Sequence, residues 1–299
     1  MKIVLAGGTG FVGRSLCNHF YSRGYDVVIL TRNPNKQTDE RFTYVEWLTK
    51  KEVNMEPLHG ADVIINLAGE SINNRWTSAM KKQILQSRIQ ATEALHQLIQ
   101  RLPENPKVYV QASAIGFYGT SDSKAFTEKH EQAGDDFLAH VVSQWEEAGQ
   151  RIEKEGIRTV YMRFGLILER TEGALPLIAL PYKLFVGGTI GRGTQWISWA
   201  HIEDVCKIIE FVIEHEKING PVNVTAPHPV EMKVFGKTLA KILKRPHWLP
   251  VPAFALNILL GEMSMLITEG QRVLPEKALH HGFQFQYNHV REALEQLYD

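Results

Sequence analysis

The fold is decided by an N-terminal segment that reads Lys2-Ile3-Val4-Leu5-Ala6-Gly7-Gly8-Thr9-Gly10-Phe11-Val12-Gly13. Residues 2–6 form a short apolar run that is typical of a buried strand, and helical spacing of apolar residues begins at Phe11. Gly24 is placed to end that helix in a left-handed cap, and residues 26–30 are a second apolar run. A strand, a glycine turn, a helix and a strand within about thirty residues predict one βαβ unit.

The glycines of this turn have separate roles in a dinucleotide site. Gly7 allows the tight turn, Gly10 lets the backbone approach a pyrophosphate, and Gly13 lets the helix pack against the strand. The N–H groups at the start of the helix, together with the positive end of its dipole, favour an anion there. The alternative is an ordinary glycine-rich turn, but the position between strand and helix favours a cofactor site. We therefore expect the cofactor to contact Gly7, Thr9, Gly10, Phe11, Val12 and Gly13.

The residues after the second strand indicate which dinucleotide is bound. An NAD site usually carries Asp or Glu at this point, whereas this chain has Thr31-Arg32. A guanidinium can pair with a 2′-phosphate and lie over the adenine face, which a carboxylate cannot do. Thr31 and Arg32 therefore predict NADP(H) as the cofactor; the alternative for Arg32 is a solvated surface side chain.

Composition limits the possible partners and the location. The chain has 299 residues, 44% of them hydrophobic, and its 33 Lys and Arg balance 33 Asp and Glu, so we expect neither a nucleic-acid nor a membrane partner. No apolar run approaches the roughly 20 residues of a membrane span, and a chain that starts directly with a strand leaves no room for a signal peptide. Cys17 and Cys206 lack metal or redox spacing, and His280-His281 lacks metal spacing. We expect a cytoplasmic protein with reduced thiols and no metal site.

Two segments further along are expected to form the wall of the cofactor site. Residues 61–69 contain a buried parallel strand that ends in Leu67, Ala68 and Gly69, where small residues let a cofactor pass along the backbone. A simple turn is the alternative for Gly69. Residues 76–101 predict a long helix capped by Thr77 or Ser78, and Arg88 near its middle faces either the cofactor or water.

Residues 107–113 predict the next strand, with Ser113 at its carboxyl end and Tyr118 shortly after. Ligands of doubly wound sheets bind at this end of the strands, so the Ser113 hydroxyl is a candidate to orient a substrate carbonyl, assisted by Tyr118. The alternative is a serine that caps a loop. Beyond this point the pattern predicts strands at 157–168, 196–199 and 221–225, and helices at 175–186, 202–215 and 230–243.

The motifs together resemble the extended short-chain dehydrogenase/reductases, and more narrowly their atypical epimerase-family branch, often described as nucleotide-sugar epimerase-like. The resemblance implies a Rossmann-type α/β fold, and it implies that the segment after Arg163, including Ile167, lines the nicotinamide end of the site. It rests on Gly7–Gly13, Asn66–Glu70, Trp76, Lys82, Ser87-Arg88, Ser113, Tyr118-Gly119, Asp136–Leu138, Trp145-Glu146, Gly187-Gly188, Gly191, Gly193, Gln195-Trp196, Trp199, His201, Asp204, Gly261-Glu262, Gln271, Pro275 and Gly282-Phe283.

The chain departs from that superfamily at its catalytic residues. The superfamily reacts through Tyr-x-x-x-Lys, and Leu138 and Val142 stand where those two residues are expected. A missing general acid/base typically costs roughly 10²–10⁴ in rate. The usual pair of hydroxyl residues is also reduced to Ser113-Ala114. Substitute acids are Tyr118, His140, His201 and Glu70, although His140 also fits a surface residue and His201 also fits the start of helix 202–215.

We expect a doubly wound parallel sheet in residues 1–168, to which 194–226 return, and a smaller C-terminal substrate lobe from 169–193 and 227–299. Two functions are compatible with the sequence. One is an NADP(H)-dependent oxidoreductase or epimerase-like enzyme acting on a small polar substrate, with Ser113 and Tyr118 as catalytic residues. The other is an NADP(H)-binding sensor or regulatory protein that has lost turnover with the Tyr-x-x-x-Lys pair.

Overall fold

The computed structural model describes residues 1–37 and 39–299, and at its centre lies a parallel sheet with strand order β11-β7-β5-β4-β1-β2-β3. The chain runs outward from β1 through β2 to β3, then returns to β4 on the other side of β1 and continues through β5 and β7 to β11. The reversal between β1 and β4 is the switch point at which doubly wound sheets bind their ligands. The predicted Rossmann-type α/β fold is confirmed.

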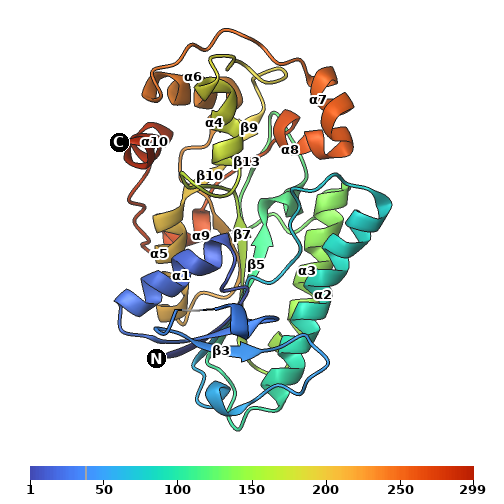
Figure 1. Cartoon of the computed structure of the whole chain (residues 1–299), viewed down its shortest axis with the longest axis vertical. Helices are drawn as coiled ribbons and strands as arrows, with labels where there is room; N and C mark the ends of the chain where they lie inside the picture. Colours follow the sequence, from blue (N-terminus) through green and yellow to red (C-terminus); the bar gives the residue numbers. More distant parts are fainter. Residues whose placement is uncertain (38) are drawn as a thin grey trace.

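The βαβ unit predicted at the N-terminus is present, and helices cover both faces of the sheet. In Figure 1, α1 and α5 lie on one side and α2 and α3 on the other. The strands are β1 (Lys2–Ala6), β2 (Asp26–Thr31), β3 (Thr43–Glu46), β4 (Val63–Asn66), β5 (Val108–Ala114), β7 (Arg158–Phe164) and β11 (Gly220–Val224). The covering helices are α1 (Phe11–Ser22), α2 (Ser78–Gln100), α3 (Phe137–Glu153) and α5 (Ile202–Glu214).

Two apolar cores hold these layers together, one on each face. Leu16 and Phe20 of α1 and Ile209 of α5 are fully buried against one face, and Leu95 of α2 and Ile152 of α3 are fully buried against the other. Strands that are covered on both faces are expected to be apolar throughout, as Val63–Ile65 are here. Burial on both faces therefore fixes the position of the strand ends that form the site.

A third core belongs to a C-terminal lobe at the carboxyl ends of the strands, and Leu175, Phe235 and Leu294 are completely buried in it. The elements of this lobe and its surroundings are α4 (Leu175–Lys183), α6 (Met232–Ile242), α7 (Ala253–Leu260), α8 (Met265–Thr268), α9 (Glu276–His280), α10 (Val290–Tyr298) and the short strand pairs β8 (Leu166–Leu168) with β10 (Trp199–His201), β9 (Trp196–Ile197) with β12 (Val230–Glu231), and β6 (Ala125–Phe126) with β13 (Arg272–Val273). Single 3₁₀ turns complete the chain at η1 (Pro34–Lys36), η2 (Glu56–Leu58), η3 (Ile115–Tyr118) and η4 (Gly261–Ser264).

The strand predicted over 157–168 is wrong as one element, because Gly165 divides it. The Gly165 N–H still donates to the Val224 carbonyl at 3.1 Å, but the next residue, Leu166, donates to the Ser198 carbonyl at 2.8 Å. The chain therefore leaves the main sheet at Gly165 and pairs with β10 as β8. A Cβ on Gly165 would overlap the Ser198 carbonyl oxygen, so the crossing requires glycine.

Several element boundaries differ from the sequence prediction. Helix α4 ends at Lys183 instead of residue 186, because Phe185 takes a positive φ of 64°. Residues 196–199 are two short strands with different partners, and residues 230–231 form β12 ahead of α6. The caps were predicted well. Gly24 has φ +77°, and the Thr77 hydroxyl accepts a hydrogen bond from the Met80 N–H.

The proposed division into domains remains our interpretation. It is supported by β11, which pairs with β7 of the main sheet, and by α4, which packs with α6 and α10 in the third core.

Replacing Gly165 by alanine tests the division of the strand. Because the added Cβ would meet backbone and not a mobile side chain, we expect Gly165→Ala to lower the free energy of unfolding by about 1–3 kcal/mol in urea denaturation. Gly116→Ala is the matched control, because the nearest atom to its Cβ would be the Leu138 Cβ at 3.3 Å, so a shift of a few tenths of an ångström would accommodate it. Equal losses for both variants would contradict this account of Gly165.

Candidate functional site

The turn between β1 and α1 brings three backbone segments into direct contact. Gly7 has φ +82°, and a Cβ there would lie 2.8 Å from the backbone carbonyl carbon of Leu67. A Cβ on Gly13 would overlap the Gly7 carbonyl oxygen. The tight turn expected at Gly7 is present, and the close packing expected at Gly13 is present too. Gly13 packs against Gly7 and Gly8, however, and not against the strand itself.

This turn leaves the start of α1 open. Gly10 is the N-cap, its N–H donates to the Gly7 carbonyl at 3.0 Å, and no side chain caps the helix. The first turn of α1 contains no acidic residue. The N–H groups of Phe11 and Val12 have no acceptor within the helix, so they and the helix dipole favour an anion at this point. The glycine positions and the bare helix start fit a diphosphate.

A loop of the C-terminal half folds over the start of α1. Glu172 forms an ion pair with Arg14, and Gly173, with φ +73°, packs against the Phe11 ring and near the Ile167 carbonyl oxygen. Phe11 and Ile167, both predicted to contact the cofactor, therefore lie beside the same residue. The structure brings together the two ends of the predicted site that are most distant in sequence.

The end of β2 borders a cavity of about 350 Å³. Thr31 is buried and its hydroxyl accepts a hydrogen bond from the Asn33 N–H at 3.3 Å, whereas Arg32 is exposed and lines the cavity. The other lining residues are Glu70, Ala79, Lys82, Gln83, Gln86, Ser87 and Gln90. The cavity combines two cations with amide groups and one carboxylate, and all but Arg32 and Glu70 of these residues come from α2.

The segment after β4 is fixed in place by buried and half-buried side chains that hydrogen-bond to its backbone. The Asn66 side chain is fully buried, accepts a hydrogen bond from the Ala68 N–H at 3.1 Å and donates to the hydroxyls of Thr92 and Tyr109. The Ser87 hydroxyl accepts from the Glu70 N–H at 2.9 Å. These contacts fix the course of Leu67, Ala68 and Gly69, which are partly accessible along the predicted cofactor wall.

Arg88 supports the same segment. Its Nη1 donates to the carbonyl oxygens of Glu70 at 3.0 Å and Ile84 at 2.9 Å, and its guanidinium carbon lies 5.0 Å from the centre of the Trp145 ring. A Cβ on Gly69 would lie 3.1 Å from the Arg88 side chain. Burial lowers the pKa of Arg88 to about 10. Arg88 therefore packs against the loop at residues 69 and 70. Its contact with the cofactor stays a prediction.

Ser113, Glu146 and Arg163 form a buried polar cluster at the carboxyl end of β5. The Ser113 hydroxyl donates to Glu146 Oε1 at 2.6 Å, and Arg163 donates to both oxygens of that carboxylate, Nε at 2.8 Å and Nη2 at 2.7 Å. Burial opposes the charge of Arg163, but hydrogen bonds and attraction from Glu146 outweigh it and raise its pKa above the ordinary value. The hydroxyl predicted to orient a substrate is thus committed to Glu146.

Tyr118 is committed in a similar way. It is 4% exposed, its hydroxyl donates to Asn223 Oδ1 at 2.8 Å, and its ring stacks on Phe126 with a centroid distance of 5.2 Å. Burial raises the pKa of Tyr118, although the nearby Arg163 opposes the shift. Tyr118 is therefore a protonated, hydrogen-bonded phenol at neutral pH.

The part of α3 that packs against η3 is apolar. Leu138 contacts Gly116, and Val142 is buried with Phe117 and Tyr118. These are the positions at which the superfamily's Tyr and Lys are expected, so no proton donor projects from them.

The other candidate acids lie in different surroundings. His140 is exposed on α3. His201 is buried as the N-cap of α5, where Nδ1 accepts from the Glu203 N–H at 3.2 Å and Nε2 meets Gln296 at 2.9 Å, as its alternative role at the helix start predicted. Glu70 borders the cavity beside Arg32. None of the three lies in the cluster around Ser113.

Across residues 1–37 and 39–299, no group of three or more His, Cys, Asp or Glu side chains is arranged to hold a metal ion. Within the same residues no helix is both long and apolar enough to cross a membrane.

Sequence reasoning did not predict several residues that shape the site. Asn223 accepts a hydrogen bond from the Tyr118 hydroxyl. The buried Glu128 carboxylate accepts hydrogen bonds from the backbone N–H groups of Asn223 at 2.9 Å and Lys277 at 3.2 Å. Lys82 borders the cavity beside Arg32. Only Lys82 had a usable signal, because it is one of the residues on which the family resemblance rests, together with Ser87 and Arg88, although it was not predicted to contact the cofactor.

Glu146→Gln tests the buried cluster. Removing the carboxylate leaves the Arg163 guanidinium buried without a counter-charge, so we expect a loss of about 3–5 kcal/mol in the free energy of unfolding, measured in urea. Ser113→Ala removes one hydrogen bond to a charged group and should cost less, about 1.5–3 kcal/mol.

Glu93→Gln is the matched control, because Glu93 pairs with Arg151 at 3.0 Å on the surface. Exposed pairs contribute about 0–1 kcal/mol. A loss for Glu146→Gln as small as that of the control would show that the cluster does not stabilise the fold.

Comparison with known proteins gives a consistent assignment. Residues 3–148 match the NAD dependent epimerase/dehydratase family, and residues 251–297 match a domain of unknown function. The chain is 52% identical over 297 residues to the epimerase family protein YfhF of Bacillus subtilis, covering 99% of this chain and 98% of the relative. It is 41% identical to epimerase family protein SH2119 of Staphylococcus haemolyticus, over 100% of this chain and 99% of the relative.

Solved structures agree with the sequence relatives. The human epimerase family protein SDR39U1 with NADPH has a TM-score of 0.88 and 29% identity, covering 99% of both chains. A nucleoside-diphosphate sugar epimerase from Corynebacterium glutamicum has a TM-score of 0.80 and 29% identity, covering 100% of this chain and 58% of that one. The chain therefore belongs to the NAD-dependent epimerase/dehydratase family, among the relatives named epimerase family proteins.

Proposed function

We propose that this protein binds NADP(H) and acts as an oxidoreductase or epimerase-like enzyme on a small polar substrate of the nucleotide-sugar type. The observation that carries the proposal is the pairing of an open helix start at Gly10 with a cation-lined cavity at the end of β2. The first fits the diphosphate and the second fits the adenosine end of the same molecule, because the β1–β2 unit places them on one edge of the sheet.

Arg32 and Lys82 would recognise the 2′-phosphate. Both line the cavity of about 350 Å³, Arg32 directly after β2 and Lys82 from α2, so a phosphate between them would meet cations from two elements. Glu70 in the same cavity would repel a phosphate at close range, which favours a position nearer to Arg32 and Lys82. Gln83, Gln86 and Gln90 supply neutral hydrogen-bonding groups for an adenosine.

The remaining cofactor contacts follow the strand ends. The backbone N–H groups of Phe11 and Val12 would bind the diphosphate, and Leu67, Ala68 and Gly69 would let the ribose pass. Ile167 would border the nicotinamide end, where the bound cofactor supplies or accepts a hydride. The presence of NADPH with the human relative supports this choice of cofactor.

We assign catalysis to Ser113 and Tyr118, with a restricted role for each. Hydride transfer to a carbonyl requires a proton donor, and Tyr118 carries a proton at neutral pH; burial raises its pKa and so makes it a weak acid, which restricts this role. Tyr118 would have to exchange its hydrogen bond with Asn223 for one to substrate. Ser113 would likewise have to exchange its hydrogen bond to Glu146 for one to the substrate carbonyl before it could polarise that carbonyl.

A second candidate function is an NADP(H)-binding sensor or regulatory protein without turnover. The observation that favours it is that both hydroxyls donate to buried protein partners, at 2.6 Å for Ser113 and 2.8 Å for Tyr118, while Leu138 and Val142 present no acid or base.

We also propose a cytoplasmic location. Cys17 and Cys206 are free and buried, and burial raises the pKa of each thiol to about 12. Thiols of this kind are unreactive packing groups and suit a reducing compartment.

Cofactor preference can be measured by thermal unfolding. NADPH should raise the melting temperature more than NADH does, and a ligand at about 100 times its dissociation constant stabilises the fold by about 2.7 kcal/mol. Arg32→Glu should abolish or reverse this preference, because the carboxylate repels the 2′-phosphate and accepts hydrogen bonds from an unphosphorylated ribose.

Lys36→Glu makes the same charge change on an exposed residue outside the cavity, and it should leave the preference unchanged. Equal stabilisation of the unmodified protein by NADPH and NADH would refute the assignment of Arg32.

Turnover distinguishes the two candidate functions. We expect the near-ultraviolet absorbance of NADPH to fall when nucleotide sugars or small carbonyl compounds are supplied, and Tyr118→Phe to slow that change by roughly 10²–10⁴. Tyr21→Phe, on an exposed ring, is the matched control. Intact NADPH binding with neither an absorbance change nor conversion of any compound in the panel would establish the sensor instead, because an epimerase returns its hydride and consumes no cofactor overall.

A further inference from the structure

Charge is distributed very unevenly along this chain. Residues 173–202 and 232–261 together contain seven Lys or Arg and no Asp or Glu, so the rest of the chain carries a formal charge of −7. Both segments belong to the C-terminal half and contribute α4, α6 and α7. A formal net charge of zero therefore conceals one basic and one acidic region.

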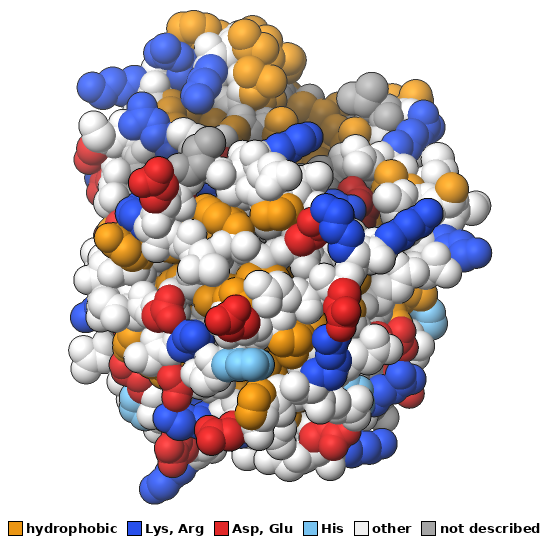
Figure 2. All heavy atoms as spheres, turned by 60° about the horizontal axis from the view of Figure 1, so that its bottom comes forward, with side chains coloured by type: hydrophobic (Ala, Val, Ile, Leu, Met, Phe, Trp, Pro, Cys, Tyr) orange, Lys and Arg blue, Asp and Glu red, His pale blue; other side chains and the backbone are white. Residues whose placement is uncertain are grey.

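The same two segments carry most of the exposed large hydrophobic side chains. Among the described residues, ten of the fifteen exposed large hydrophobic side chains belong to them. Figure 2 shows hydrophobic side chains beside Lys and Arg at the upper edge of the molecule, the end that carries α4, α6 and α7 in Figure 1. The ten residues are Leu177, Leu180, Leu184, Phe185, Val186, Val234, Trp248, Leu249, Phe254 and Ile258.

Hydrogen bonds join the centre of this surface into one patch. The Trp248 backbone N–H donates to the Gly187 carbonyl at 3.0 Å, and its indole N–H donates to the Phe185 carbonyl at 2.9 Å. The Arg245 guanidinium carbon lies 4.5 Å from the centre of the Phe185 ring. Phe185 is nevertheless 54% exposed and Trp248 66% exposed. We use the name basic apolar patch for Leu184, Phe185, Val186, Trp248 and Leu249 together with the exposed basic residues of the same two segments. Those basic residues are Lys183, Lys233, Lys237, Lys241, Lys244 and Arg245.

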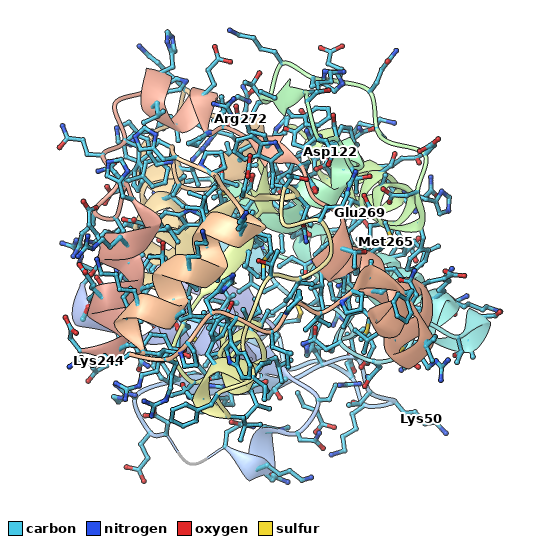
Figure 3. The ribbon with its side chains drawn as sticks, turned by 90° about the horizontal axis from the view of Figure 1, so that it is seen from above. Lys50, Asp122, Lys244, Met265, Glu269 and Arg272 are labelled. Atoms are coloured by element: carbon cyan, nitrogen blue, oxygen red, sulfur yellow. The ribbon has the colours of Figure 1, made fainter. Side chains whose placement is uncertain are left out.

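The cations of the patch are free to bind an outside anion. Arg192 is not among them, because it pairs with Asp122 at 2.8 Å and with Glu269 at 3.8 Å; Figure 3 shows these two acids on the same side of the molecule. The other six basic residues of the two segments are exposed, and none forms an ion pair within residues 1–37 and 39–299. They are Lys183, Lys233, Lys237, Lys241, Lys244 and Arg245.

The composition of the patch favours a lipid surface over a protein partner. Protein interfaces are enriched in Arg and depleted in Lys, whereas five of these six cations are Lys. A second copy of the chain in a two-fold arrangement would place this basic surface, whose two segments contain no Asp or Glu, against the same surface of its partner. Lysines that reach anionic headgroups while Leu, Phe and Trp enter the acyl boundary are typical of proteins that lie on a membrane surface.

We propose that the basic apolar patch binds the surface of an anionic phospholipid membrane. The cations draw the C-terminal lobe to the headgroups, and the exposed side chains of residues 184–186 and 248–249 insert at the interface. No segment crosses the bilayer in this arrangement. The site requires neither bound cofactor nor turnover, so it is independent of the proposed catalytic function.

Sedimentation of the full chain with phospholipid vesicles tests this inference. The protein should sediment with vesicles that contain phosphatidylglycerol and remain in solution with pure phosphatidylcholine, and added salt should weaken the binding. Each Lys near an anionic surface contributes on the order of fivefold in partitioning. Phe185→Ser combined with Lys244→Glu should therefore lower vesicle binding roughly tenfold or more.

Leu48→Ser combined with Lys50→Glu is the matched control. Leu48 is exposed and takes a positive φ as Phe185 does, and Lys50 lies far from Lys244 in Figure 3. The control should bind vesicles as the unmodified protein does, and both double variants should keep a cooperative thermal transition. The proposal is overturned if the protein stays in solution with anionic vesicles, or if the patch variant binds these vesicles as well as the unmodified protein does. Loss of a dimer in the patch variant, in a protein that binds no vesicles, would show instead that the patch is an interface between two copies of the chain.

Discussion

The site depends on one steric constraint, the contact between the β1–α1 turn and the end of β4. Gly7 lies against the Leu67 backbone, and Gly13 lies against the Gly7 carbonyl, with no room for a side chain at either position. This contact aims the bare start of α1 at the switch point of the sheet and sets β4 beside it. Because backbone atoms make the contact, the position of the uncapped helix start is determined by the fold and not by rotamers.

Beneath the strand ends lies a layer of polar side chains whose hydrogen bonds are made within the protein. Asn66 and Arg88 hold the loop after β4, and Glu146 holds Ser113 and Arg163 together. Such a layer makes the surface above it rigid, since each buried group that lost its partner would cost free energy. It also reduces the number of groups that are free to react with substrate. Leucine and valine stand where the family's general acid/base is expected, so any turnover must take its proton from another group, for which Tyr118 is our candidate.

The fold could be predicted in large part from local sequence. Gly24 and Thr77 end and begin helices through their own backbone or hydroxyl, and the apolar runs of β1, β2 and β4 need no distant partner to be recognised. The errors arose where a distant segment decides the structure. Gly165 divides a strand because Ser198 lies against it, and Ser113 is occupied because Glu146 and Arg163 meet it from α3 and β7. Short-range patterns in the sequence contain no information about such partners.

The net charge of the chain also gives no information about where its charged residues lie. Equal numbers of basic and acidic residues argue against a charged partner only if the charges are mixed over the surface, and here the basic ones lack acids across α4, α6 and α7. Folding sharpens the asymmetry, because Arg192 finds Asp122 and Glu269 while Lys244 and Arg245 remain exposed beside Phe185 and Trp248. Exposed aromatic and basic groups in one patch contribute little to the stability of an isolated chain. The gathering of these aromatic and basic side chains around α4, α6 and α7 is therefore better explained by contact with a surface outside the protein than by the packing of the C-terminal lobe itself.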